Sequence, residues 1–396
     1  MDMKTEHYAK SEPFGIYVHV PFCLSKCPYC DFYSVPYQEQ TVLQYCKAAQ
    51  RAIACAPQAG RRADSVYFGG GTPVLLGEHL SELLQAIRER YTLTEDCEIT
   101  LEANPAAMTL ETLIKLRKSG FNRISMGVQS ASDKELSYLG RRHSFAQALE
   151  SVQLAKAAGF ENISVDLMLG TPEQNRRSVD RFITAFFEEG VQHISGYLLK
   201  IEPGTPFAKQ QIEKICPDED TDADLYLYTV EQMNRHGYFQ YEVSNFAKPG
   251  FESKHNLKYW RCQEYLGIGP AAHSFLGSER FYFPRDLQRF LSEENVWDLA
   301  ERDGEGGDWF EYLMLRMRLR EGIGLTDFSN RFKVDTAALL QKAKQLEKHG
   351  LTKITGDRIS LTPNGFLISN SVIVELAEQV GIIEKETVVN AFDRRM

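Results

Sequence analysis

Segments with strand and helix patterns alternate along residues 16–199, and this alternation constrains the fold more than any other feature. Short apolar segments that favour β-strands are each followed by a longer segment with a helical pattern. The predicted strands are 16–20, 65–68, 97–102, 123–128, 163–169 and 193–199, and the predicted helices are 38–56, 80–90, 109–119, 133–139, 144–158 and 179–189. Repeated βαβ units form a parallel sheet with right-handed crossovers. Because six units fall short of the eight that close a barrel, we expect an α/β fold with an open, partial (β/α)6 barrel.

The pattern changes after Gly204, and the chain divides into three predicted regions. Residues 1–204 form the barrel, 205–303 an extension of it, and 304–396 a C-terminal α+β region. In the last region a helical pattern is followed by 351–355 and 358–361, which flank Gly356-Asp357 as the strands of a hairpin do. Helices, a hairpin and a further helix predict a winged-helix-like domain at the C-terminal end. The acidic, Gly-rich stretch 303–307 is the predicted linker before this domain.

Three cysteines, Cys23, Cys27 and Cys30, follow the first predicted strand with the spacing C-x3-C-x2-C. Thiolates this close together can share one [4Fe–4S] cluster, and three ligands for four irons leave one iron with an open position. The alternative is a loop of free or zinc-bound thiols. Zinc sites usually contain two cysteine pairs or Cys/His pairs, and no second pair follows here at that spacing. The spacing therefore favours an iron–sulfur cluster.

Composition indicates a globular protein of a reducing compartment. The chain has 396 residues, of which 43% are hydrophobic and 25% charged, and its net charge is −9. The N-terminus lacks the apolar segment of a signal peptide, and no apolar run reaches transmembrane length. Five further cysteines are scattered, as reduced thiols are. We expect a cytoplasmic protein, and the acidic charge argues against a nucleic-acid partner.

The cysteine motif and the residues before it, Gly15-Ile16-Tyr17-Val18-His19-Val20-Pro21-Phe22-Cys23, resemble a known signature. It is that of the radical S-adenosylmethionine (radical SAM) superfamily, in its coproporphyrinogen-oxidase-like branch. In that superfamily the open iron binds S-adenosylmethionine, and an electron from the cluster cleaves the sulfonium to give a 5′-deoxyadenosyl radical. The resemblance implies that Cys23, Cys27 and Cys30 hold the cluster and that an electron donor is a partner.

A glycine-rich stretch, Gly69-Gly70-Gly71-Thr72-Pro73, follows the second predicted strand. Glycines at such a place let the backbone approach a ligand closely and offer accessible N–H groups, although a triple glycine is often only a turn. The stretch resembles the superfamily's motif for the amino group of S-adenosylmethionine. The resemblance assigns that contact to Gly70, Gly71 and Thr72.

Polar side chains lie at or near the ends of later strands, where the reactive loops of such folds are found. A buried carboxylate needs a partner, so these groups either bind a ligand or form internal salt bridges with Arg123 or Arg141. The resemblance assigns the ribose and carboxylate of S-adenosylmethionine to Glu102, Gln129, Arg141 and Asp166, and it places Tyr17 and Tyr29 along the same site. Arg142 is adjacent to Arg141 and could take its role.

The stretch His255-Asn256-Leu257-Lys258-Tyr259-Trp260 is the most diagnostic part of the second half. An imidazole can ligate a haem iron, and large aromatic rings can line a macrocycle. From chemistry alone, a His capping a turn beside packed aromatic side chains is the alternative. The stretch resembles the haem-binding motif H-N-x-x-Y-W of the HemW haem chaperones. The resemblance makes His255 the candidate haem ligand, and His273 is either a second-choice ligand or a group that supports the ligand.

The resemblance leaves three functions open. The first is a haem chaperone that carries a [4Fe–4S] cluster, binds S-adenosylmethionine and delivers haem to an acceptor apo-haemoprotein, for which a membrane-bound respiratory protein is one option. The second is an oxygen-independent coproporphyrinogen III oxidase, and the third another methyl- or haem-processing radical enzyme. The oxidase motif is C-x3-C-x2-C-x-C, whereas Phe32 stands at its last position here. We therefore expect the chaperone, without coproporphyrinogen oxidase activity.

Overall fold

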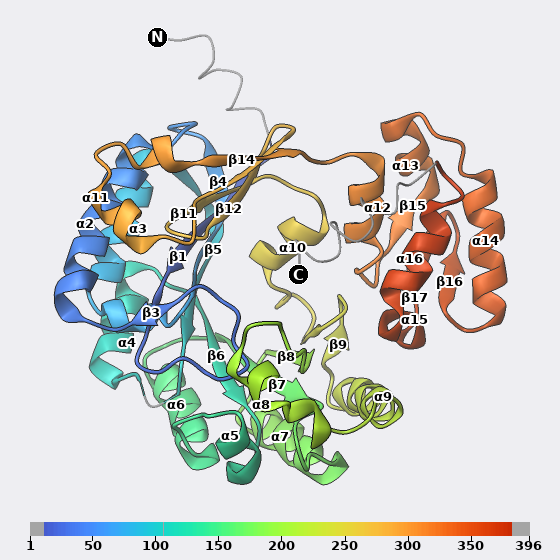
Figure 1. Cartoon of the computed structure of the whole chain (residues 1–396), viewed down its shortest axis with the longest axis horizontal. Coiled ribbons are helices and arrows are strands. Elements are labelled where there is room, and N and C mark those ends of the chain that lie inside the picture. The colour runs from blue at the N-terminus through green and yellow to red at the C-terminus, as the bar shows by residue number, and fades with distance from the viewer. Residues whose placement is uncertain (1–11, 106, 382–396) are drawn as a thin grey trace.

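A twelve-stranded sheet organises the structure, a computed structural model that describes residues 12–105 and 107–381 (Figure 1). Its strand order within these ranges is β14-β13-β12-β11-β1-β4-β5-β6-β7-β8-β10-β9. Neighbouring strands from β1 to β8 in this order pair in parallel, which confirms the predicted partial (β/α)6 barrel. These parallel strands are β1 (Phe14–Val20), β4 (Arg62–Gly70), β5 (Thr92–Ala103), β6 (Arg123–Gln129), β7 (Asn162–Leu169) and β8 (His193–Leu198).

The crossover helices gather along one side of this sheet (Figure 1). They are α2 (Glu39–Cys55), α3 (His79–Arg90), α4 (Leu110–Ser119), α5 (Asp133–Tyr138), α6 (Phe145–Ala157) and α7 (Arg176–Glu188), and a 3-10 turn, Pro73–Leu76, precedes α3. Local sequence explains their ends. Ser144 and Gln147 form a reciprocal capping box at the start of α6, and Gly120 takes the left-handed conformation that ends α4.

The two faces of the parallel strands differ in polarity. Alternate residues such as Ile124, Met126 and Val128 are buried in the hydrophobic core with the helices. The residues between them face the barrel interior and are polar, and cross-strand hydrogen bonds such as Ser164–His193 and Tyr67–Glu102 join them there. The interior is therefore a polar chamber rather than an apolar core.

The segment after β8 adds strands to both edges of the barrel sheet. Strands β9 (Phe239–Gln240) and β10 (Asn245–Ala247) continue antiparallel beyond β8, whereas β11 (Tyr265–Ile268) pairs in parallel with β1. Strands β12 (His273–Leu276), β13 (Glu279–Tyr282) and β14 (Glu301–Glu305) follow β11 antiparallel. The helices of this segment are α8 (Pro206–Gln210), α9 (Glu219–Arg235), α10 (Lys254–Trp260) and α11 (Leu287–Ser292), with 3-10 turns at Ile212–Lys214 and Val296–Leu299. The short strands β2 (Phe22–Cys23) and β3 (Val35–Pro36) pair separately.

The C-terminal unit stands apart from the barrel in Figure 1. It contains α12 (Trp309–Arg316), β15 (Ile323–Gly324), α13 (Leu325–Phe332), α14 (Ala337–Lys348), β16 (Thr352–Thr355), β17 (Arg358–Leu361), α15 (Pro363–Leu367) and α16 (Ser369–Ala377). Two helices followed by the β16–β17 hairpin confirm the winged-helix-like outline.

The predicted linker 303–307 is wrong in part, because residues as far as Glu305 belong to β14. In this strand Glu305 pairs with Glu279 and Gly304 pairs with Arg280 of β13, and the Gly-rich composition does not predict this pairing. The unit is also held to the sheet by a buried ion pair of 2.7 Å between Arg280 of β13 and Glu311 of α12. In the described part of the chain, no helix has the length and apolar character needed to cross a bilayer.

Candidate functional site

The three cysteines lie on a loop that leaves the C-terminal end of β1, which we name the cluster loop (residues 21–37). Its two ends are held together because β2 pairs in parallel with β3, with Phe22 opposite Val35 and Cys23 opposite Pro36. Between them the chain turns back, and the N–H of Cys30 donates to the carbonyl of Cys27 over 3.1 Å. All three thiols are half-buried and unpaired by disulfides. The loop therefore presents three sulfurs from a framework that backbone hydrogen bonds fix.

A chain of hydrogen bonds connects two of these sulfurs through residues that follow β4, β5 and α5. Thr72 Oγ1 lies 3.7 Å from Cys23 Sγ and accepts from Asn104 Nδ2 at 2.8 Å. Asn104 Oδ1 in turn accepts from Arg141 Nη2 at 2.7 Å, and Arg141 Nη1 donates to Cys27 Sγ at 3.3 Å. Donors directed at sulfur favour the thiolate over the thiol, and they also tune iron–sulfur clusters. Their presence is consistent with the cysteines acting as ligands.

The three thiols can be compared with the needs of two kinds of metal site. Within the described ranges, no group of three or more His, Cys, Asp or Glu side chains could hold a single metal ion. A mononuclear zinc site needs such a convergent group, whereas a [4Fe–4S] cube takes one thiolate at each of three separate irons. Burial, with the nearby Cys27 and Cys23 thiols, raises the pKa of Cys30 to about 11, and a bound cationic centre would reverse this. Three thiolates on one loop are a donor set that fits such a cube.

A cleft of about 280 Å³ opens next to these sulfurs, and Cys27, Thr72, Asn104 and Arg141 are among the residues that line it. Gly127 of β6 lies against the side chains of Arg141 and Asn104. A Cβ there would lie 3.1 Å from both Arg141 Nη2 and Gln129 Nε2, and 3.2 Å from Asn104 Oδ1. A side chain at this position would therefore crowd these three polar groups and require them to shift.

The glycine-rich stretch runs from the end of β4 against the start of the cluster loop. Its amide groups differ from the expectation, since the N–H groups of Gly71 and Thr72 already donate to Val20 and Phe22 carbonyls at 2.8 and 2.7 Å. Gly70 has a φ of +108°, and a Cβ there would lie 2.5 Å from the ring of His19. The glycines thus allow the second strand to lie directly against the cluster loop, and carbonyls rather than N–H groups are left for a ligand.

Glu102 is the best-connected predicted carboxylate. It accepts from the Tyr67 hydroxyl at 2.7 Å and from the Gly70 N–H at 3.1 Å. Burial raises its pKa despite these hydrogen bonds. Tyr17 lies in the same layer, and its hydroxyl is 3.1 Å from His19 Nδ1.

Asp166 and Gln129 face the same chamber with incomplete partners. Burial, reinforced by the charge of Glu102, raises the pKa of Asp166 to about 7, although Ser195 hydrogen-bonds to it. Gln129 has a φ of +77° at a register shift between β6 and β7, and its buried Oε1 has no hydrogen-bond partner. A bulge of this kind redirects a side chain, and an unsatisfied buried amide oxygen is costly unless a ligand donates to it. Both residues therefore have unused hydrogen-bonding capacity.

Tyr29 projects from the cluster loop against Arg141, and its hydroxyl contacts both Arg141 and Cys27. Burial raises its pKa, which keeps the phenol neutral. Its ring packs on Phe207 of α8 at 6.1 Å between centroids. Arg142, the alternative to Arg141, is exposed and lines the cleft without contacting a cysteine sulfur in any hydrogen bond of the described residues. The structure thus brings Arg141, and not its neighbour, to the sulfur.

His255 begins α10 on the far side of the chamber, with 1% of its surface exposed. Its Nδ1 lies 2.9 Å from Ser65 Oγ and its Nε2 2.7 Å from the Tyr259 hydroxyl, so both ring nitrogens have partners. The ring stacks on Tyr67 at 5.2 Å, and burial lowers its pKa to about 3. In this conformation neither nitrogen is available to a haem iron, and ligation would require Nε2 to leave Tyr259.

Three groups that the sequence analysis did not single out join these residues together. Asn104 bridges Thr72 and Arg141, Tyr67 holds Glu102, and His19 connects Tyr17 to the carbonyl of Tyr33, to which its Nε2 is 2.9 Å away. Asn104 is two residues after Glu102, so the period-two pattern of a strand could have placed it on the same face.

Comparisons with known proteins agree with this geometry. Residues 17–186 match the family described as the Radical SAM superfamily, and residues 308–368 match the HemN C-terminal domain. Heme chaperone HemW of Mycobacterium tuberculosis is 35% identical over 375 residues, which cover 91% of this chain and 94% of that protein. Heme chaperone HemW of Escherichia coli is 33% identical over 382 residues, covering 92% and 98%. The solved structure of coproporphyrinogen III oxidase (HemN) from Escherichia coli superposes with a TM-score of 0.80 over 94% of this chain and 92% of that one, and at 23% identity it shows a shared fold.

Proposed function

The chain belongs to the HemW family of the radical SAM superfamily, and from this membership we propose that it is a haem chaperone that holds a [4Fe–4S] cluster, binds S-adenosylmethionine and passes haem to an acceptor protein. The observation that carries the proposal is the set of three half-buried cysteines with hydrogen-bond donors on two of them, in a chain that matches haem chaperones along almost its whole length.

In this proposal Cys23, Cys27 and Cys30 each bind one iron of the cluster. When bound, the cluster would supply one electron and an iron with an open position. Thr72 and Arg141 donate hydrogen bonds toward two of the sulfurs, which stabilises their negative charge. An electron donor would be needed as a partner.

S-adenosylmethionine would bind in the cleft between the cysteines and the polar chamber. Backbone carbonyls of the stretch that holds Gly70, Gly71 and Thr72 would accept from its amino group, since the N–H groups of Gly71 and Thr72 are already used. Arg141 would pair with the carboxylate, as guanidinium groups do. Glu102, Gln129 and Asp166 would accept from the ribose hydroxyls, with the unpartnered Oε1 of Gln129 as the first acceptor, and the rings of Tyr17 and Tyr29 would border the site.

Haem would be the cargo. The acceptor would be an apo-haemoprotein, for which a membrane-bound respiratory protein is one option. His255 stays a prediction as the haem ligand, because its use requires the 2.7 Å contact with Tyr259 to open. The departure from the oxidase motif at Phe32, which is 67% exposed beside the cysteines, supports a chaperone rather than an oxidase.

The test uses the full chain, reconstituted without oxygen and loaded with haem. It is mixed with haem-depleted membrane vesicles that carry a respiratory oxidase, and the recovery of oxidase activity is compared with that given by free haem at equal concentration. Faster recovery supports the proposal, and equal recovery contradicts it. A parallel anaerobic assay with coproporphyrinogen III should show no catalytic turnover, and turnover would indicate the oxidase function instead.

A further inference from the structure

Tyr67 of β4 lies between the carboxylate proposed for the ribose of the cofactor and the histidine proposed for haem. Its hydroxyl donates to Glu102 Oε1 at 2.7 Å, and its ring stacks on the ring of His255 at 5.2 Å between centroids, with an interplanar angle of 28°. Burial and the charge of Glu102 raise the pKa of Tyr67 well above its ordinary value, so the phenol remains a neutral donor. One buried side chain therefore contacts both proposed sites.

The ring of His255 is enclosed on two sides in this conformation. Tyr67 packs on one face, while Tyr259 meets the ring edge-on at 5.1 Å and places its hydroxyl 2.7 Å from Nε2. The Glu98 carboxylate accepts from the N–H groups of Lys254 and His255 at 3.2 and 3.1 Å, which fixes the backbone at the start of α10. Release of Nε2 is therefore a movement of rings, and Tyr67 packs against the ring that has to move.

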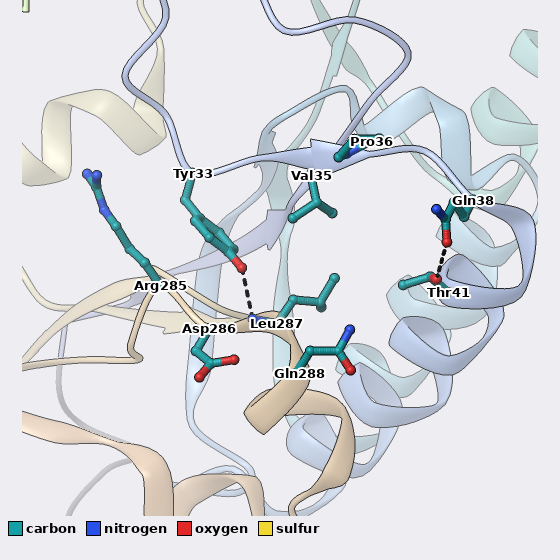
Figure 2. A pocket seen from close by; sticks show the side chains of 9 residues that line it. All are labelled: Tyr33, Val35, Pro36, Gln38, Thr41, Arg285, Asp286, Leu287 and Gln288. Carbon is teal, nitrogen blue, oxygen red and sulfur yellow. Dashed lines mark hydrogen bonds between the residues drawn. The ribbon is translucent and has the colours of Figure 1, made fainter. Parts of the chain in front are cut away.

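A third ring, Tyr17 of β1, packs against Tyr67 at 6.1 Å but is held from the cluster loop. Its hydroxyl lies 3.1 Å from His19 Nδ1, and His19 Nε2 lies 2.9 Å from the carbonyl of Tyr33. The Tyr33 hydroxyl in turn accepts from the N–H of Leu287 at the start of α11 over 2.9 Å, as Figure 2 shows. This series of hydrogen bonds fixes Tyr17, whereas the hydroxyl of Tyr67 is held by a carboxylate that the cofactor would use.

S-adenosylmethionine would bring ribose hydroxyls to a carboxylate whose two oxygens are already in use. Glu102 Oε2 accepts from the Gly70 N–H at 3.1 Å, and Oε1 accepts from Tyr67. The Gly70 N–H is fixed in the backbone, so a competing hydroxyl displaces the side-chain donor more readily. Because hydrogen bonds to a carboxylate are among the stronger side-chain contacts, the loss of this bond frees the Tyr67 ring to move.

We propose that Tyr67 is a positioning residue that couples the two ligands, so that S-adenosylmethionine at Glu102 releases Tyr67 and thereby frees Nε2 of His255 for haem. The proposal rests on the haem-chaperone function proposed above and states how one site of that function acts on the other. Since a coupling free energy is reciprocal, haem raises the affinity for S-adenosylmethionine by the same factor. Haem is then held most firmly by the form of the chain that carries the cofactor.

The test is a haem titration of the anaerobically reconstituted full chain, with and without saturating S-adenosylmethionine and with no reductant, so that the cofactor stays intact. In the wild type S-adenosylmethionine should raise the haem affinity by about 5–150-fold, the usual range of coupling between two sites. Tyr67→Phe keeps the ring but removes the hydroxyl. Its haem affinity without the cofactor should rise toward that of the wild type with it, and the cofactor should change it no further.

Tyr238→Phe is the matched control. Tyr238 is also buried, but its hydroxyl donates to the carbonyl of Val191 at 2.8 Å, before β8 and so at the opposite end of the parallel strands from Glu102. This variant should keep the wild-type ratio of haem affinities with and without S-adenosylmethionine.

The outcomes separate this coupling from the function on which it rests. If S-adenosylmethionine leaves the haem affinity of the wild type unchanged or lowers it, or if Tyr67→Phe keeps the wild-type ratio, the coupling is wrong while the chaperone function stands. A Tyr67→Phe variant that loses haem affinity under both conditions would assign the hydroxyl a structural role only and overturn the proposal. A wild type that binds no haem contradicts the function and the coupling with it.

Discussion

Arg141 Nη1 donates a hydrogen bond of 3.3 Å to the sulfur of Cys27, while Nη2 of the same guanidinium donates to Asn104 at 2.7 Å. Arg141 Nη2 also donates to the carbonyl of Gly127 in β6, so this one side chain connects the cluster loop to the barrel. A fixed cation at this point can stabilise a thiolate and still attract a carboxylate in the adjoining cleft. This contact gives the first prediction.

Arg141→Gln should leave the three thiols able to bind a cluster but weaken S-adenosylmethionine binding by about 10–100-fold, because the hydrogen bonds of a guanidinium to a carboxylate are lost. Anaerobic equilibrium binding with the cluster content measured alongside gives the answer. Arg142→Gln is the matched control, since Arg142 is adjacent and exposed. A larger loss in Arg142→Gln would assign the role to that residue.

Gly70→Ala should destabilise the protein and reduce cofactor binding, because φ is +108° and the new Cβ would lie 2.5 Å from His19. Gly60→Ala is the control, since Gly60 also has positive φ, at +77°, but nothing lies within 4 Å of its Cβ position. The conformational cost alone is about 1 kcal/mol. Urea unfolding should therefore show a distinctly greater loss for Gly70→Ala, and equal losses would mean that the His19 contact relaxes freely.

Tyr259→Phe removes the partner of the buried Nε2 of His255. An unsatisfied buried group costs about 1–3 kcal/mol, so the free energy of unfolding should fall by that amount. Tyr138→Phe provides a control, because the hydrogen bond from the Tyr138 hydroxyl to Glu173 is exposed, and it should change stability by less than about 0.5 kcal/mol. An unchanged free energy of unfolding in Tyr259→Phe would show that the contact is dispensable and that Nε2 of His255 is readily freed.

Asp166 should make stability depend on pH. Its folded pKa of about 7 lies above the unfolded value of about 4, so the folded protein holds a proton that the unfolded chain releases. This contribution is present at low pH and is lost as the pH rises through 7. Unfolding measured from pH 5.5 to 8 should therefore show a smaller decline for Asp166→Asn than for the wild type. Glu242→Gln is a useful comparison, because burial also raises the pKa of Glu242 to about 7. If the free energy of unfolding of Asp166→Asn depends on pH as steeply as that of the wild type, Asp166 ionises normally.

Much of the barrel is predictable because its local signals agree with the final fold. The predicted strand 123–128 and helix 144–158 correspond to β6 and α6 within one or two residues, since apolar alternation, a capping box and glycine stops all coincide there. The three cysteines and Arg141 are likewise close in the structure because parallel strands carry their C-terminal loops to one edge. Signals of this kind can be read from the sequence, because each depends on residues that are close together in the chain.

Other features depend on contacts between distant segments. Nothing local indicates that 303–305 completes a strand, because its partners lie in β13. The burial of His255 also depends on Ser65, which is 190 positions away in the chain. The motif around His255 suggests an accessible ligand, and only the packing of α10 on the barrel shows that both nitrogens are occupied.

The most direct test of the account is the metal content of the anaerobically reconstituted chain. The account predicts iron and acid-labile sulfide in equal amounts, about four of each per chain, with a reduced-cluster EPR signal that changes when S-adenosylmethionine is added. Both should be lost in Cys23→Ala, Cys27→Ala and Cys30→Ala and kept in the exposed control Cys55→Ala. Zinc in place of iron, absence of sulfide, or a cluster that survives replacement of any of the three cysteines would contradict it.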